Sequence, residues 1–389
     1  MSPALKTTLL LLLATAPACA GELLPVTPEQ KNEQTLVDSE QLAAAGEEAY
    51  LAFPTIVWLD DDNILISYKR GRSHALDLGA MLEIVRFDTH TNEVGARQVV
   101  GVDEGLIYQM GEWIRFPNGR IGLYADVQRV AQDGGRNRHH RTGVQWCRSD
   151  DGGRTFGPMQ EMGPVDGVEY GYIFEGIVSR GQVFMLAMSF PELTGRKSLF
   201  DEDGKRLYGE VSVLVSSDNG ESWKHVRNLS REFGGIDINE SSLAEYGEGY
   251  IVATRGYDGR ARLHVVDKDF HLVRESDMTS AHDMIRGVVG RPRLFWRDEK
   301  LYLLGRNHSA NRPSMELALF RIRPDSLAVE RYVILDPDEG ARVGDSYYAV
   351  PYFRGTGDNA LLNVITYRTQ PPRRRPDIVR LAFPWSQVH

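Results

Sequence analysis

The sequence predicts an all-β protein, built as one six-bladed β-propeller of four-stranded antiparallel blades. The main observation is a hairpin of two apolar strands around a short polar turn. Its copies begin at Phe53, Glu112, Phe174, Ser242, Arg293 and Val350. Successive starts lie 59, 62, 68, 51 and 57 residues apart, which is room for one blade. No stretch of comparable length keeps a 3.6-residue apolar period, so we expect few helices.

The intervals between the hairpins contain further strand-like runs. We assign the outer strands to residues 81–87, 142–147, 210–216 and 261–266. After the proline-rich stretch 371–376, residues 378–383 form a last strand that helps to close the ring. A pair of β-sandwiches would also contain short strands and turns, but six similar hairpins favour radial repetition.

The composition narrows the class of protein. Hydrophobic residues make up 42% and charged residues 25%, which is typical of a globular chain and excludes general disorder. The net charge is −9, with no concentrated basic segment, so we expect no nucleic-acid partner. Glycine is frequent, at 38 of 389 residues, which suits many tight turns.

The N-terminus has the pattern of a secretory signal. Lys6 precedes the apolar run 9–16, and small residues follow up to Ala20. We expect cleavage after Ala20 and a secreted or periplasmic protein. A lipoprotein attached through Cys19 is the alternative, but the residues before Cys19 fit that signal poorly. No later stretch is long enough to span a membrane.

Cleavage would leave a single cysteine, Cys147, so the mature chain has no internal disulfide. We divide the chain into the leader (1–20), an N-terminal segment (21–46) whose order the sequence leaves open, and the propeller domain (47–389). We expect a monomer that needs no cofactor or metal.

Two segments, 149–156 and 216–223, share the pattern Ser-x-Asp-x-Gly-x-Ser/Thr-aromatic at matching places in successive blades. The carboxylate can accept backbone N–H groups of its own loop, and glycine supplies a positive φ. We assign Asp151 and Asp218 to the turns and to no chemistry. The pattern resembles the Asp-box of the sialidase (neuraminidase) superfamily.

The resemblance covers nearly the whole mature chain and implies an active site at the propeller centre. Sialidases release terminal sialic acids with retention, using a tyrosine nucleophile in place of the usual carboxylate. A glutamate acts as the base of the tyrosine, an aspartate is the acid/base, and three arginines bind the sugar carboxylate.

The loop after the first hairpin reads Gly71-Arg72-Ser-His-Ala-Leu-Asp77. By resemblance Asp77 is the general acid/base and Arg72 is a subsite arginine. A solvated loop aspartate is the alternative interpretation. In the fourth hairpin, Glu240 resembles the base and Arg255 a carboxylate-binding arginine. The alternative there is a pair of exposed residues at a strand edge.

A further arginine of the triad is expected at the start of the fifth hairpin, where Arg291 and Arg293 both qualify and Arg293 is favoured. The planar guanidinium can make two parallel hydrogen bonds to a carboxylate. The nucleophile is expected near the sixth hairpin, where Tyr347 and Tyr348 are adjacent. Since side chains alternate along a strand, only one faces the centre. We favour Tyr348.

One position departs from the family. Sialidases carry Arg-Ile-Pro on the first inner strand, and Ala52 stands at the place of this arginine. Either Lys69, Arg70 or Arg72 compensates, or the substrate is not a standard sialoside.

The resemblance therefore implies an exo-glycoside hydrolase that removes a terminal acidic sugar, sialic acid or a relative, from a glycan or glycoconjugate. Two alternatives keep the fold: a polysaccharide lyase or a uronate- or rhamnose-directed glycosidase, and a non-catalytic glycan-binding propeller. A basic stretch in the second blade, residues 138–141 (Arg-His-His-Arg), either contacts sugar or is a solvated turn.

Overall fold

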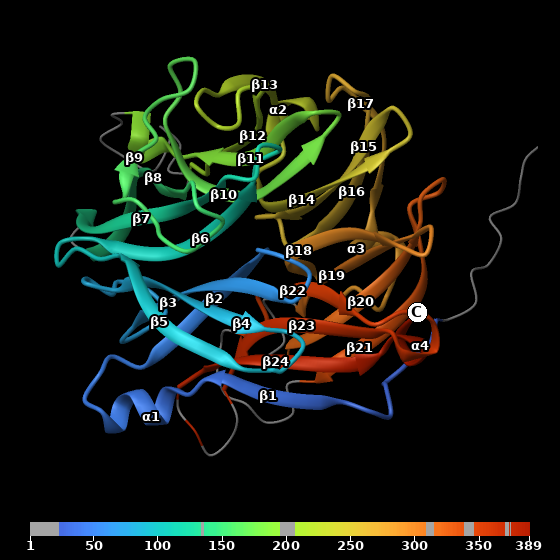
Figure 1. Ribbon diagram of the computed structural model, residues 1–389. Helices are drawn as coiled ribbons and strands as arrows, with labels where there is room; N and C mark the ends of the chain where they lie inside the picture. Colours follow the sequence, from blue (N-terminus) through green and yellow to red (C-terminus); the bar gives the residue numbers. More distant parts are fainter. Residues whose placement is uncertain are drawn as a thin grey trace, which may run out of the picture.

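The computed structural model describes residues 23–133, 136–194, 207–308, 315–337, 346–369, 373 and 375–389. Within these ranges, the strands form six four-stranded antiparallel sheets arranged as a ring (Figure 1). The predicted six-bladed propeller is confirmed. The predicted leader, 1–20, and the lipoprotein alternative at Cys19 lie outside the described residues.

The first three blades follow the chain, and the two strands of each predicted hairpin come first. Blade one consists of β2 (Tyr50–Trp58), β3 (Asn63–Gly71), β4 (Met81–Asp88) and β5 (Val94–Gly101). Blade two consists of β6 (Ile107–Arg115), β7 (Ile121–Asp133), β8 (Arg136–Ser149) and β9 (Gln160–Glu161). Blade three consists of β10 (Tyr170–Ser179), β11 (Gln182–Ser189), β12 (Glu210–Ser216) and β13 (Lys224–Asn228).

The next two blades repeat this order. Blade four consists of β14 (Ile238–Tyr246), β15 (Gly249–Gly256), β16 (Ala261–Val266) and β17 (Leu272–Asp277). Blade five consists of β18 (Val288–Arg297), β19 (Lys300–His308), β20 (Met315–Arg323) and β21 (Ala328–Pro337). The first strands of successive blades, from β2 to β18, contact one another around the ring. β3 is almost wholly buried and β5 largely exposed, so the core lies between the inner strands of adjacent blades.

The sixth blade joins the two ends of the chain. It consists of β22 (Val350–Arg354), β23 (Leu361–Arg368), β24 (Asp377–Pro384) and, outermost, β1 (Asn32–Val37). The predicted strand 378–383 is therefore confirmed as β24. Its outer partner comes from the N-terminal segment that the sequence left open, so the propeller extends to Asn32. Ser39 fixes this junction by donating to Asp377 Oδ1 from its backbone N at 2.8 Å and its Oγ at 2.7 Å.

Helices are few and short, as predicted. In the described ranges they are α1 (Ser39–Ala44), α2 (Leu229–Glu232), α3 (Met278–Ala281), α4 (Trp385–Val388) and the 3₁₀ turns Pro191–Thr194 and Gly357–Asn359. None of the helices that the structure describes has the length and apolar character needed to cross a membrane.

The segments 149–156 and 216–223 form the same turn between the third and fourth strands of blades two and three. Asp151 Oδ1 accepts from the backbone N of Arg154 and of Thr155, both at 3.0 Å. Asp218 Oδ1 accepts from Ser222 N at 2.9 Å. The hydrogen bonds, first those from Ser222, lower the pKa of Asp218 to about 2. Both carboxylates are therefore engaged in holding their turns.

His264 on β16 gives the fold a predicted sensitivity to acid. Its ring is fully buried and stacks on Phe233, with centroids 3.8 Å apart. Burial, with a contribution from the charge of Arg262, lowers its pKa to about 3. An unfolded histidine titrates at about 6.5. Below that pH the unfolded chain binds a proton that the folded chain does not, so stability falls as the pH falls from about 6.5 towards 3.

We therefore expect the melting temperature of His264→Gln to decline less steeply than that of the parent protein between pH 7 and pH 4. His271→Gln is the control, because the side chain of His271 is about half exposed. Thermal unfolding followed by circular dichroism at a series of pH values measures both. Equal slopes for His264→Gln and the parent would contradict the prediction.

Candidate active site

Bulges in the first strands of the blades aim side chains at the ring centre. In β14 the register shifts between Ile238 and Ser241, around Glu240. In β18 it shifts between Gly290 and Arg293, and Arg291 there has a φ of 46°. An extra residue in one strand bends that strand and redirects its side chains. Glu240 is consequently almost fully buried, with 3% of its surface exposed.

Tyr348 meets Glu240 at this centre. The Tyr348 hydroxyl donates a hydrogen bond to Glu240 Oε1. The adjacent Tyr347 has a φ of 64°, and its hydroxyl donates to Asp336 Oδ2 at 2.9 Å within another apolar cluster. Of the two tyrosines considered from the sequence, Tyr348 is thus the one that contacts Glu240.

Two donors hold the second oxygen of Glu240. Arg255 Nη1 lies 2.7 Å from Glu240 Oε2, and the backbone N of Arg291 lies 2.8 Å from it. Burial alone would raise the pKa of Glu240, but Arg255, the hydrogen bond from Tyr348 and further arginines outweigh it and lower the pKa to about 2. Glu240 is therefore a carboxylate at neutral pH, and its Oε1 is the acceptor for the tyrosine hydroxyl.

Arg306 is a cation of this centre that the sequence reasoning missed. Its guanidinium carbon lies 5.0 Å from the centroid of the Tyr348 ring, and its Nη1 donates to Ser346 O at 3.1 Å. Arg306 pairs with Gly290 just before the bulge of blade five, as Lys69 pairs with Ala52 before the bulge of blade one. Aligning the second strand of each predicted hairpin would have placed Arg306 at the same position as Lys69 and so indicated it as a candidate.

Arg291 and Arg293, both proposed from the sequence as substrate-binding residues, are buried in an ion cluster. Arg291 Nη2 and Arg293 Nη2 both donate to Glu112 Oε2 on β6, the latter at 2.6 Å. Arg293 Nη1 also lies 3.3 Å from Glu175 Oε1 on β10. Because blades two and five face each other across the ring, this cluster ties opposite walls together (Figure 1).

Blade one presents an aromatic ring at the centre. Ala52 is fully buried, and Phe53 follows it with a φ of 58°. The Phe53 ring lies 5.1 Å from the Tyr348 ring, centroid to centroid. The nearby cations have other partners, since Lys69 donates to Ser73 O at 2.8 Å and Arg70 donates to Glu83 at 2.6 Å.

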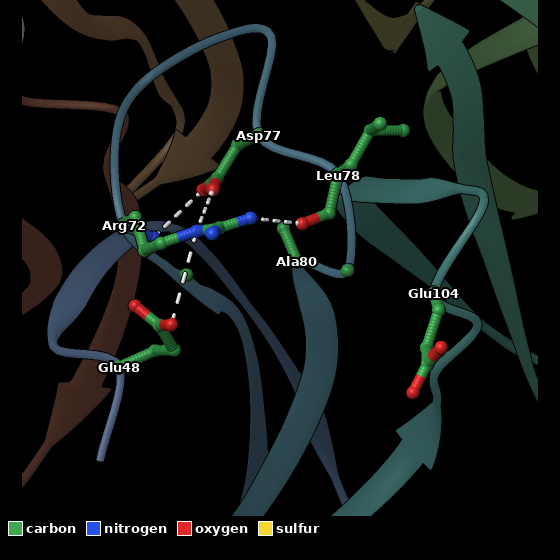
Figure 2. Close-up of a pocket in the computed structure, with 8 residues that line it drawn as sticks. Glu48, Arg72, Asp77, Leu78, Ala80 and Glu104 are labelled. Carbon is green, nitrogen blue, oxygen red and sulfur yellow. Dashed lines mark hydrogen bonds and ion pairs between the residues drawn. The ribbon is translucent and has the colours of Figure 1, made fainter. Parts of the chain in front are cut away.

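Asp77 and Arg72 lie together in the loop after β3 (Figure 2). Asp77 Oδ2 accepts from the backbone N of Arg72 at 2.9 Å and of Ser73 at 3.1 Å, and lies 3.3 Å from Lys69 Nζ. The Arg72 side chain is 60% exposed and borders a cavity of about 320 Å³ with Asp77. The loop approaches Tyr348 through His74, whose ring lies 5.3 Å from that of Phe53.

Apart from Tyr347, which pairs with Asp336, the site residues expected from the sequence fall into three groups. Glu240, Tyr348 and Arg255 are in direct contact. Arg291 contacts this trio through its backbone N, and the side chains of Arg291 and Arg293 are both ion-paired to Glu112. Asp77 and Arg72 share a separate loop.

No family model matches the sequence, and no curated protein matches it. Solved structures do match. An unknown-function protein from Dyadobacter fermentans is 13% identical, with a TM-score of 0.66 over 91% of this chain and 99% of that one. The intramolecular trans-sialidase from Ruminococcus gnavus is 11% identical, with a TM-score of 0.58 over 88% of this chain and 96% of that one.

The Trypanosoma rangeli sialidase, in a complex with 2,3-difluorosialic acid described as a covalent intermediate, is 12% identical. The TM-score is 0.57, over 94% of this chain and 60% of that one. At such low identity the likeness concerns the fold: this chain has the six-bladed β-propeller fold that sialidases share.

Proposed function

We propose that the protein is a sialidase-like exo-glycoside hydrolase that removes a terminal acidic sugar from glycans with retention of configuration. The observation that carries the proposal is the hydrogen bond from the Tyr348 hydroxyl to the ionised Glu240, beside Arg255 and Arg306. A phenol ionises in water only at about pH 10, so it needs such a base at the moment of attack.

In the first step Glu240 accepts the phenolic proton, and the Tyr348 oxygen forms a bond to the anomeric carbon. The bond from that carbon to the leaving oxygen breaks, and the leaving oxygen takes a proton from Asp77. In the second step a water molecule gives a proton to Asp77 and attacks the same carbon. The tyrosine leaves and recovers its proton from Glu240.

We assign the binding of the sugar carboxylate to Arg255 and Arg306. Both are close to Tyr348. Arg255 is also paired with Glu240, but its side chain is 24% exposed, whereas those of Arg291 and Arg293 are 2% and 7% exposed and share Glu112. Phe53, next to Ala52, packs its ring against that of Tyr348 on the blade-one side. Two arginines and an apolar neighbour suit an acidic sugar that is held by fewer charge-assisted hydrogen bonds than a standard sialoside. A uronate is therefore the second candidate substrate.

The role of Asp77 has its own expected result. To protonate a leaving oxygen, Asp77 must turn from the backbone N–H groups of Arg72 and Ser73, and the loop tip at Leu76 is 44% exposed. Asp77→Asn should lower kcat/KM on an alkyl glycoside by about 100-fold or more. An aryl glycoside with a good leaving group should lose much less, because it needs little protonation. Steady-state kinetics on both substrates measure this, and equal losses would contradict an acid role.

Product identification tests the whole proposal. The purified protein would be incubated with aryl and lactose-linked sialosides and with the corresponding glucuronides. A fluorinated glycosyl donor should label Tyr348, as mass spectrometry of peptides would detect. An unsaturated product absorbing in the near ultraviolet would instead indicate a lyase, and binding without turnover a non-catalytic propeller. We also propose that residues 1–20 are a secretory leader and that 149–156 and 216–223 are Asp-boxes.

A further inference from the structure

A second cavity, of about 340 Å³, lies between the elements that carry the proposed acid and the proposed base. Ala75 and Leu76 line it from the loop of Asp77. Tyr257 lines it from the chain immediately after Arg255. Segments of blades two and three complete the wall. Asp77 itself borders the first cavity, and its loop neighbours Ala75 and Leu76 connect the proposed acid to this second one.

Arg141 on β8 connects the cavity to the centre. It lines the cavity, and its guanidinium carbon lies 4.1 Å from the Phe190 ring and 5.8 Å from the Tyr172 ring. The Tyr172 hydroxyl accepts from Arg291 Nη1 at 3.4 Å, and Arg291 is the residue whose backbone holds Glu240. Arg141, Tyr172 and Arg291 thus form a chain of contacts from the cavity to Glu240.

One wall of the cavity is aromatic. The rings of Tyr208 and Tyr257 stack with centroids 4.0 Å apart and planes at 27°. Tyr257 is 39% exposed, so part of its ring is open to solvent. Tyrosine combines an apolar face with a hydroxyl, which suits the mixed surface of a pyranose ring.

Another part of the lining is basic. Arg138, His139 and Arg141 line it, and Glu192 is the one carboxylate among the described lining residues. Arg141 pairs with Asp126 at 3.5 Å, a distance longer than a hydrogen bond. Burial raises the pKa of Asp126, whereas the charges of Asp126 and Glu192 raise the pKa of Arg141. Arg141 Nε is buried and has no hydrogen-bond partner in the described part of the chain.

We infer that this cavity binds the leaving group and favours a sugar with an anionic substituent, a sulfate or a carboxylate. The aromatic pair would pack against the ring, and Arg138 and Arg141 would donate to the anion. The assignment of this cavity to the leaving group rests on the proposed function, whereas the binding of an anionic sugar in it does not. The sequence left residues 138–141 as either a sugar contact or a solvated turn, and this inference assigns them to sugar binding.

Equilibrium binding tests the site without turnover. Isothermal titration calorimetry would compare N-acetyllactosamine, its 6-sulfated form and a glucuronic acid disaccharide. We expect the two anionic sugars to bind about tenfold more tightly, the size of one charge-assisted hydrogen bond. Arg138→Ala should abolish this difference. Arg154→Ala, at an exposed turn of the second blade, removes the same charge elsewhere and should retain it. Equal affinities, or no binding of either anionic sugar, would overturn the inference.

Turnover separates this inference from the proposed function. Sialosides of N-acetyllactosamine with and without the 6-sulfate would be compared for kcat/KM. A higher value for the sulfated substrate, lost in Arg138→Ala, supports both proposals. Turnover without any preference overturns the leaving-group assignment alone. Tight binding of the sulfated sugar without turnover of any substrate refutes the hydrolase and leaves an anionic-glycan site.

Discussion

Tyr348→Phe is expected to reduce kcat/KM for an acidic glycoside by about a thousandfold or more, because the change removes the nucleophilic oxygen. The aromatic ring remains, so its packing against Phe53 and Tyr367 is kept. Glu240 loses one hydrogen bond but keeps those from Arg255 and from the backbone of Arg291. The loss should therefore appear in kcat, with KM little changed.

Tyr347→Phe is a closely matched control. It deletes the same atom from the adjacent residue, where the hydroxyl is also buried and also donates to a carboxylate, that of Asp336. We expect a modest loss of stability, about 1 kcal/mol, and nearly unchanged kinetics. Activity lost in Tyr347→Phe but retained in Tyr348→Phe would place the nucleophile at Tyr347. Equal retention in both would remove tyrosine catalysis from the proposal.

The choice between these tyrosines shows where strand alternation stops being a guide. Only Tyr348 contacts Glu240, but both tyrosines precede β22, which begins at Val350, so strand alternation does not apply to them. The positive φ of Tyr347 decides which of the two tyrosines faces the centre. Neither the residue type of Tyr347 nor the residues next to it indicate that conformation in the sequence. The contact between Glu240 and Arg255 was predictable, because both residues belong to one hairpin and local pairing brings them together.

Long-range contacts were harder to predict. The hairpins could be recognised because apolar alternation is a local property, and the ring followed from counting them. The strand β1 pairs with β24, more than 300 residues later, and short polar strands such as β1 give little apolar signal. The partners of Arg291 and Arg293 could not be found from spacing either. Glu112 reaches them across the ring, so only the assembled propeller shows that these arginines are occupied.

Glu112→Ala is expected to have the largest effect on stability. Glu112 is 5% exposed and its Oε2 accepts from both Arg291 and Arg293, which are themselves 2% and 6% exposed. Without the Glu112 carboxylate, two buried guanidinium groups have less negative charge close by to balance them. Breaking a buried ion pair by deleting one partner costs about 3–5 kcal/mol in the free energy of unfolding. Chemical denaturation at neutral pH would measure this loss.

Glu221→Ala is the comparison that shows how much of the loss in stability is due to burial. Glu221 is also shared by two arginines, Arg120 and Arg148, but its side chain is 50% exposed. Water screens such pairs, so we expect this variant to lose at most about 1 kcal/mol. Equal losses in the two variants would mean that Glu112 contributes no more than a surface ion pair. In that case Arg291 and Arg293 would be held by the packing of β18, and their guanidinium groups would be available to a substrate carboxylate after all.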